Sequence, residues 1–247
     1  MERSDGFYPQ YGFRGNYNCR IYAEIAIENY YHAIDAYTVI KEIRHYCGKT
    51  IDAGDRLIKQ STVSIVFSAA TIEAFLNDYA AACIGDDDFY ENFDRLSVIS
   101  KLQMIAQFIM HTAIDKSQSC YGCLKRLEND RNKLIHSKSF DGAKHGYGYT
   151  ESEIQEISES LSKMGDSVET IIDLDQYKDI LASVRNGIKA IKELAMFMDK
   201  NDKNAFAIIR LFSPMSSQKL YEKNHPLVRV LHEFGVPLQH KIHEFLN

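Results

Sequence analysis

Apolar residues recur at helical spacing along most of the chain, and no convincing run alternates apolar and polar residues as a half-buried strand would. Between Pro9 and Pro214 there is no proline, and this stretch is rich in Ala, Leu, Ile, Glu and Lys. Glycines such as Gly48, Gly54 and Gly85 fall at intervals suited to helix ends. The pattern predicts an all-α fold, an antiparallel helix bundle.

The individual helices follow from the same periodicity and from turn signals. Helices are predicted over residues 18–47, 61–84, 96–111, 119–137, 150–165 and 175–199. The helix over 61–84 is apolar on nearly all sides, which is typical of a central helix. In the tail, Pro226 suits a first helical turn and Gly235 suits a helix stop.

The chain of 247 residues is long enough to bury a core within one domain. We expect an irregular arm over residues 1–16, a helical bundle over 17–200, and a C-terminal helical extension over 201–247 that packs on the bundle. The transition at residue 201 rests on composition, because three of the four prolines lie in the tail.

Charge, apolar runs and cysteines bear on the partners and the cellular compartment expected for the protein. The net charge of -5 provides no overall basic field for nucleic acid, so any RNA contact must be local. No signal-peptide pattern and no apolar run of about 18 residues is present, which favours a cytoplasmic protein without a membrane partner. The five scattered cysteines suit reduced thiols.

A polar motif interrupts the apolar stripe of the helix over 119–137. Leu127, Arg131 and Leu134 are spaced by four and three, so Arg131 occupies a position where an apolar residue is expected. Asn132 and His136 are four apart, and Arg131 lies about 140° from His136 around an ideal helix. The arginine and the histidine therefore flank a groove.

These residue types suit the cleavage of RNA. The reaction needs one proton taken from the 2'-hydroxyl and one given to the leaving oxygen, and histidine titrates nearest neutrality. A guanidinium stabilises the negative charge that develops on the phosphate. Two copies of the motif across a two-fold axis would supply both acid and base, and no metal is required.

The segment from Arg131 to His136 reads Arg-Asn-x3-His, and it follows a hydrophobic helix in which residues 70–76 read Ala-Thr-Ile-Glu-Ala-Phe-Leu. On these residues, over about 17–200, the chain resembles the HEPN superfamily (higher eukaryotes and prokaryotes nucleotide-binding), whose bacterial members carry an Arg-x4-6-His signature. The resemblance implies an all-α bundle, a homodimer and metal-independent endoribonuclease activity, often in toxin or antiphage systems with an antitoxin or defence-system partner.

Carried onto this chain, the resemblance makes Arg131 and His136 the catalytic pair, with Asn132 supporting the site. Some members of the superfamily are instead non-catalytic RNA-binding or protein-assembly modules, and this alternative stays open. The His-x-Tyr arrangement of one toxin branch is absent, because Ser137 and Lys138 follow His136. Modification of that tyrosine is therefore not implied.

The residues also allow a purely structural role for the motif. Glu73 interrupts the most apolar helix and needs a partner, so it is expected to pair with Arg131, whether to hold a catalytic residue or only to stabilise the bundle. His136 would then cap the helix C-terminus.

The loop after His136 carries cations and aromatic residues suited to single-stranded RNA, and Lys138, Lys144 and Tyr147 are the expected contacts. A solvated loop can have the same composition.

Metal chemistry has weak support in the sequence. Cys120 and Cys123 have the spacing of a metal knuckle, but no second pair follows. Glu42-x-x-His45 and Glu222-x-x-His225 match di-iron bundles in spacing, but the full carboxylate set is missing. No metal and no cofactor is expected.

Overall fold

A computed structural model describes residues 18–43, 47–135, 155, 174–202, 205–212 and 225–236. Regular structure in these ranges is helical, and no strand occurs among them, so the all-α prediction is confirmed. The predicted arm over 1–16 and the predicted helix over 150–165, apart from residue 155, lie outside the described residues.

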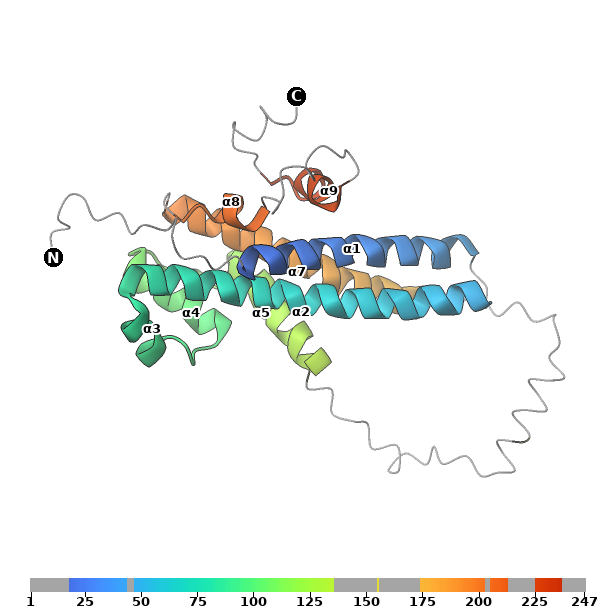
Figure 1. The fold of residues 1–247 in the computed structure, drawn as a ribbon, viewed down its shortest axis with the longest axis horizontal. Helices are drawn as coiled ribbons and strands as arrows, with labels where there is room; N and C mark the ends of the chain where they lie inside the picture. Colours follow the sequence, from blue (N-terminus) through green and yellow to red (C-terminus); the bar gives the residue numbers. More distant parts are fainter. Residues whose placement is uncertain are drawn as a thin grey trace.

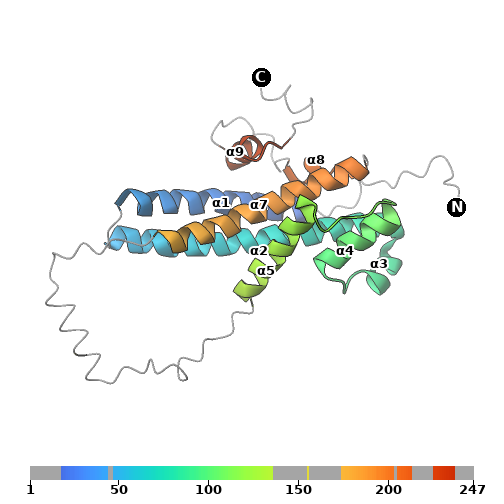
Figure 2. The ribbon, with the colours of Figure 1, turned by 180° about the vertical axis from the view of Figure 1, so that it is seen from behind.

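Three long helices form the body of the molecule. Helix α1 (Asn18–Ile43) and helix α2 (Gly48–Ile84) run antiparallel, and α7 (Asp175–Asn201) lies along both (Figures 1 and 2). The apolar face of α2 contributes Ile72, Phe75 and Leu76 to the core, each at most 1% exposed. The predicted central position of this helix is confirmed, because α2 packs against α1, α5 and α7.

Shorter elements cover this body. They are α3 (Asp86–Asn92), α4 (Val98–Met104), the π-helical turn η1 (Ile105–Ile109), α5 (Ser119–Ile135), α8 (Ala207–Phe212) and α9 (Pro226–Glu233). Helices α3 and α4 gather at one end of α2, whereas α8 and α9 lie on the opposite side of the bundle from the C-terminal end of α5 (Figure 1). None of the described helices combines the length and the apolar character needed to span a bilayer.

The start of α2 differs from the sequence prediction. The helix begins at Gly48 instead of residue 61, so Gly54 lies inside it and marks no helix end. A Cβ atom at Gly54 would lie 3.3 Å from the hydroxyl oxygen of Tyr177 on α7. This glycine therefore serves close packing between helices.

Helix ends elsewhere follow local chemistry. Gly85 ends α2 with φ of 92°, a conformation that glycine adopts easily. Asp86 to Asp88 form the first turn of α3, where acidic residues are favoured by the helix dipole. The helix predicted over 96–111 is shorter and changes to a π-helical turn at Ile105.

Pro226 and Gly235 bound α9 as predicted, with Pro226 in the first turn and Gly235 at φ of 58°. The cysteines also agree with expectation, since all five are free thiols.

Helices α2, α5 and α7 meet at a glycine. A Cβ atom on Gly187 of α7 would lie 2.9 Å from Oγ and 3.1 Å from Cβ of Ser68 on α2, and 3.6 Å from Cδ1 of Leu127 on α5. Ordinary side chains do not fit at this separation. The absence of a side chain at Gly187 is therefore what lets the three helices approach.

The end of α9 is tied to α1 by a shared carboxylate. The hydroxyl groups of Tyr30 and Tyr31 donate to Glu233 at 2.6 and 2.9 Å, and the two phenols are each 3% exposed. Arg185 of α7 lies 3.7 Å from the same carboxylate, and the guanidinium of Arg229 stacks 3.9 Å from the Tyr31 ring centre. We call this set the α9 latch.

Gly187→Val should lower the free energy of unfolding by about 1–3 kcal/mol, because the added methyl groups have no space between α2 and α5. Gly122→Ala is the control, since a Cβ there meets nothing within 4 Å and alanine favours the helix by up to about 1 kcal/mol. Urea unfolding of both variants checks this. Equal stability of Gly187→Val and wild type would contradict the close approach.

The α9 latch predicts a loss of stability in alkali. Burial, followed by the bonds to Glu233, raises the pKa of Tyr30 and Tyr31 above the ordinary value of 10.0. The folded protein therefore holds these protons more tightly, so their contribution is complete below pH 10 and falls as the pH rises further. Relative to wild type, Tyr30→Phe/Tyr31→Phe should flatten this fall by up to about 1.4 kcal/mol per pH unit for each tyrosine. Urea unfolding between about pH 9 and pH 11 measures it, and identical slopes would contradict the prediction.

Candidate functional site

Helix α5 is buried in its first half and leaves the bundle in its last turns. Leu124 and Leu127 are each 2% exposed, and the side-chain amide of Asn186 on α7 donates to the Cys123 carbonyl at 3.2 Å. Beyond them, Leu134 is 38% and Ile135 49% exposed. Figure 2 shows this end of α5 projecting away from the three long helices. The motif thus lies where the helix emerges from the core.

The structure brings Arg131 and Asn132 together at this point of emergence. Both are half-buried, and Nη1 of Arg131 donates to Oδ1 of Asn132 at 3.3 Å. Within the described ranges, no carboxylate forms an ion pair with Arg131. The remaining guanidinium donors can therefore bind an external anion such as a phosphate.

The expected pairing of Glu73 with Arg131 is wrong. Glu73 lies 3.4 Å from Nζ of Lys101 on α4, and this amine also donates to Oδ1 of Asn77 at 2.8 Å. Lys101 is 1% exposed, so its aliphatic stem fills the space between α4 and α2 while its amine reaches the polar edge of α2. The partner of Glu73 therefore comes from another helix, α4. Residue spacing within α2 does not reveal such a partner.

His136, Lys138, Lys144 and Tyr147 lie outside the described residues. Their roles as general acid or base and as RNA contacts remain predictions from the sequence.

An open groove runs between α5 and α7 on another side of the motif helix. It is lined by Gly122, Lys125, Arg126, Asn129, Asp130, Lys133, Asp179 and Ser183. Arg131 follows Gly122 by nine residues, which places it about 180° around the helix from the centre of the groove. The groove and the Arg131 pair are therefore two separate polar surfaces of α5.

Charges of both signs line this groove. Asp130 Oδ2 accepts no hydrogen bond and lies 3.9 Å from Nε of Arg126. Lys125, Lys133 and Asp179 add two cations and one further carboxylate. The mixed lining gives the groove no clear preference for an anionic ligand.

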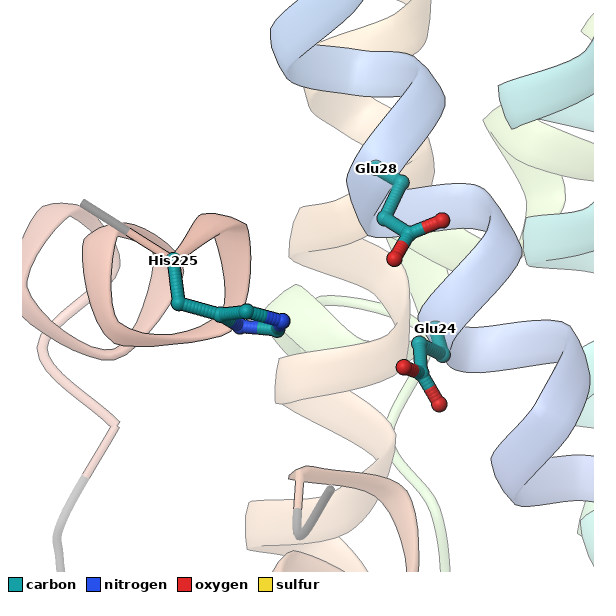
Figure 3. Close-up of side chains that lie close together, drawn as sticks. All are labelled: Glu24, Glu28 and His225. Atoms are coloured by element: carbon teal, nitrogen blue, oxygen red, sulfur yellow. The ribbon is translucent and has the colours of Figure 1, made fainter. Parts of the chain in front are cut away.

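Among the described residues, one set brings potential metal ligands together. The ligand atoms of Glu24, Glu28 and His225 all lie within 4.8 Å of one another (Figure 3). Sequence spacing does not reveal this set, because His225 is about 200 residues from the two glutamates, whereas Glu222 lies at Glu-x-x-His spacing from it. Cys120 and Cys123 are both buried thiols, and burial raises the pKa of Cys120 to about 12, which disfavours the thiolate that zinc requires.

Comparison of the chain with family models, with curated proteins and with solved structures gave no match.

Glu73 and Lys101 should respond differently to truncation. Glu73→Ala should cost at most about 1 kcal/mol, because Glu73 is 45% exposed and the buried Lys101 amine keeps its hydrogen bond to Asn77. Lys101→Ala should cost about 1–3 kcal/mol, because it also removes a buried stem between two helices. Thermal unfolding of both variants measures the difference, and a larger effect at Glu73 would contradict it.

Proposed function

We propose that the protein is a metal-independent endoribonuclease of the HEPN type, which cleaves RNA by attack of the 2'-hydroxyl at a composite site in a homodimer. The observation that carries the proposal is the half-buried guanidinium of Arg131, which no described carboxylate neutralises. The structural role expected for Arg131 required Glu73, and that carboxylate belongs to Lys101.

Each residue of the motif has a role in this proposal. Arg131 binds the scissile phosphate and stabilises the charge that develops on it. Asn132 accepts one guanidinium hydrogen and so fixes the direction of the others. His136 takes the proton from the 2'-hydroxyl in one protomer and gives a proton to the leaving oxygen in the other. Lys138, Lys144 and Tyr147 hold the flanking RNA.

The projecting end of α5 supports the dimer. Leu134 and Ile135 are large exposed apolar side chains that lie two and three residues after Asn132. Burial of such residues against a second copy would bring two motifs together and remove apolar surface from water. By the same resemblance we propose a role as a toxin or antiphage effector, controlled by an antitoxin or another defence protein.

A non-catalytic RNA-binding or protein-assembly module of the same fold is the second candidate. Its support is the groove between α5 and α7, where Lys125, Arg126 and Lys133 can each contact a phosphate, although Asp130 and Asp179 in the same lining reduce the net positive charge. The two candidates differ in whether RNA is cut or only bound.

The deciding experiment is RNA cleavage in EDTA by purified wild type and variants of equal helicity. His136→Ala should reduce the rate at least about 100-fold and Arg131→Ala by about 100- to 1,000-fold, because each removes a group that acts in the transition state. Arg126→Ala and Glu73→Gln should cleave like wild type, since Arg126 lies on the groove side and Glu73 pairs with Lys101.

Other outcomes separate the alternatives. RNA binding without cleavage by any protein would favour the binding module. Equal cleavage by wild type and His136→Ala would exclude this motif as the active site. A marked fall in melting temperature for Arg131→Ala would assign that arginine to the bundle instead of the substrate.

A further inference from the structure

Two glutamates of α1 and the residue that precedes α9 face one another. Glu24 and Glu28 lie one helical turn apart, so their carboxylates point from the same face of α1. The imidazole of His225 extends toward them from the start of α9 (Figure 3). His225 is 8% exposed, whereas both glutamates are partly exposed. The three side chains therefore face one another between α1 and α9.

The two walls of this site are fixed by contacts outside it. At the far end of α9, Glu233 binds Tyr30 and Tyr31 of α1, which hold the short helix against the same helix that carries the glutamates. Leu227, Val230 and Leu231 bury the inner face of α9. A ligand at the site would thus meet two helices that are already held together, which lowers the entropic cost of binding.

We propose that Glu24, Glu28 and His225 bind a divalent transition-metal ion of the Zn²⁺, Co²⁺ or Mn²⁺ class. Two carboxylates and one imidazole form a mixed oxygen and nitrogen donor set, which suits these ions better than Mg²⁺ or Ca²⁺, whose protein ligands are oxygens. Three protein ligands leave at least one position for water.

Metal binding at His225 would compete with the hydrogen bond by which this residue caps α9. Its Nδ1 accepts a hydrogen bond from the backbone N–H of Leu227 at 3.2 Å and caps α9, so the proton of the neutral ring is on Nε2, the other ring nitrogen. A metal bound at Nε2 requires this proton to move to Nδ1, which then cannot accept from Leu227. Metal binding and the cap bond therefore exclude each other.

This metal site is independent of the proposed ribonuclease chemistry. It involves α1 and α9, and its ion would join the C-terminal helix to the bundle. Cleavage in EDTA tests the ribonuclease without this ion, so failure of either proposal leaves the other standing.

The test is metal binding by the full chain after treatment with EDTA and exchange into metal-free buffer. Calorimetric titration with Zn²⁺ should give one equivalent per chain and raise the melting temperature, and Co²⁺ should give a visible absorption spectrum. Glu24→Gln/Glu28→Gln should weaken binding at least about tenfold. His225→Asn should do the same, and because asparagine is a good N-cap it keeps the start of α9 intact. Glu42→Gln, at an exposed glutamate of α1 outside the set, should bind like wild type.

No saturable binding by wild type would overturn the proposal. Equal affinity of wild type and Glu24→Gln/Glu28→Gln would also overturn it, since the ion would then bind elsewhere. Equal affinity of wild type and a folded His225→Asn would reduce the site to a pair of surface carboxylates and would exclude the imidazole ligand.

Discussion

The contact of Gly187 with Ser68 sets the separation of α7 and α2, and the position of α5 depends on it. Ser68 is fully buried, and Leu127 of α5 rests against the same glycine. A larger residue at Gly187 would push α7 outward, and the bond from Asn186 to the Cys123 carbonyl would move with it. The position at which Arg131 leaves the core therefore depends on the contact of α2, α5 and α7 at Gly187, which the absence of a side chain at this residue allows.

Helix α5 changes its environment along its length, and this gradient produces the candidate site. Its first turns contribute Cys120, Cys123, Leu124 and Leu127 to the core. Past Leu127 the same helical face meets fewer neighbours, so Arg131 can take an apolar position without the full cost of burying a charge. The guanidinium is restrained by Asn132 and still accessible from solvent. Partial burial of this kind strengthens electrostatic interactions with a bound phosphate.

Periodicity and turn residues predicted the helical class and both ends of α9, because these depend on interactions close in sequence. The central position of α2 was predicted from its apolar character on nearly all sides, which only a buried helix shows. The start of α2 and the role of Gly54 were not predictable, since Tyr177 lies on a helix more than a hundred residues away. The predicted partner of Glu73 was wrong for the same reason, because Lys101 contacts Glu73 across the interface between α4 and α2. Glu24, Glu28 and His225 likewise come together only when α9 packs against α1 in the folded protein, so their sequence positions do not predict the set.

The α9 latch also bears on the order in which the protein folds. Tyr30 and Glu233 are 203 positions apart, so the entropy of closing this loop opposes their contact until the intervening helices have packed. During synthesis from the N-terminus, the two tyrosines of α1 leave the ribosome long before their carboxylate partner. Until Glu233 arrives, the surface that α9 later covers is open to water. Docking of α9 is therefore expected among the last events of folding and the first of unfolding.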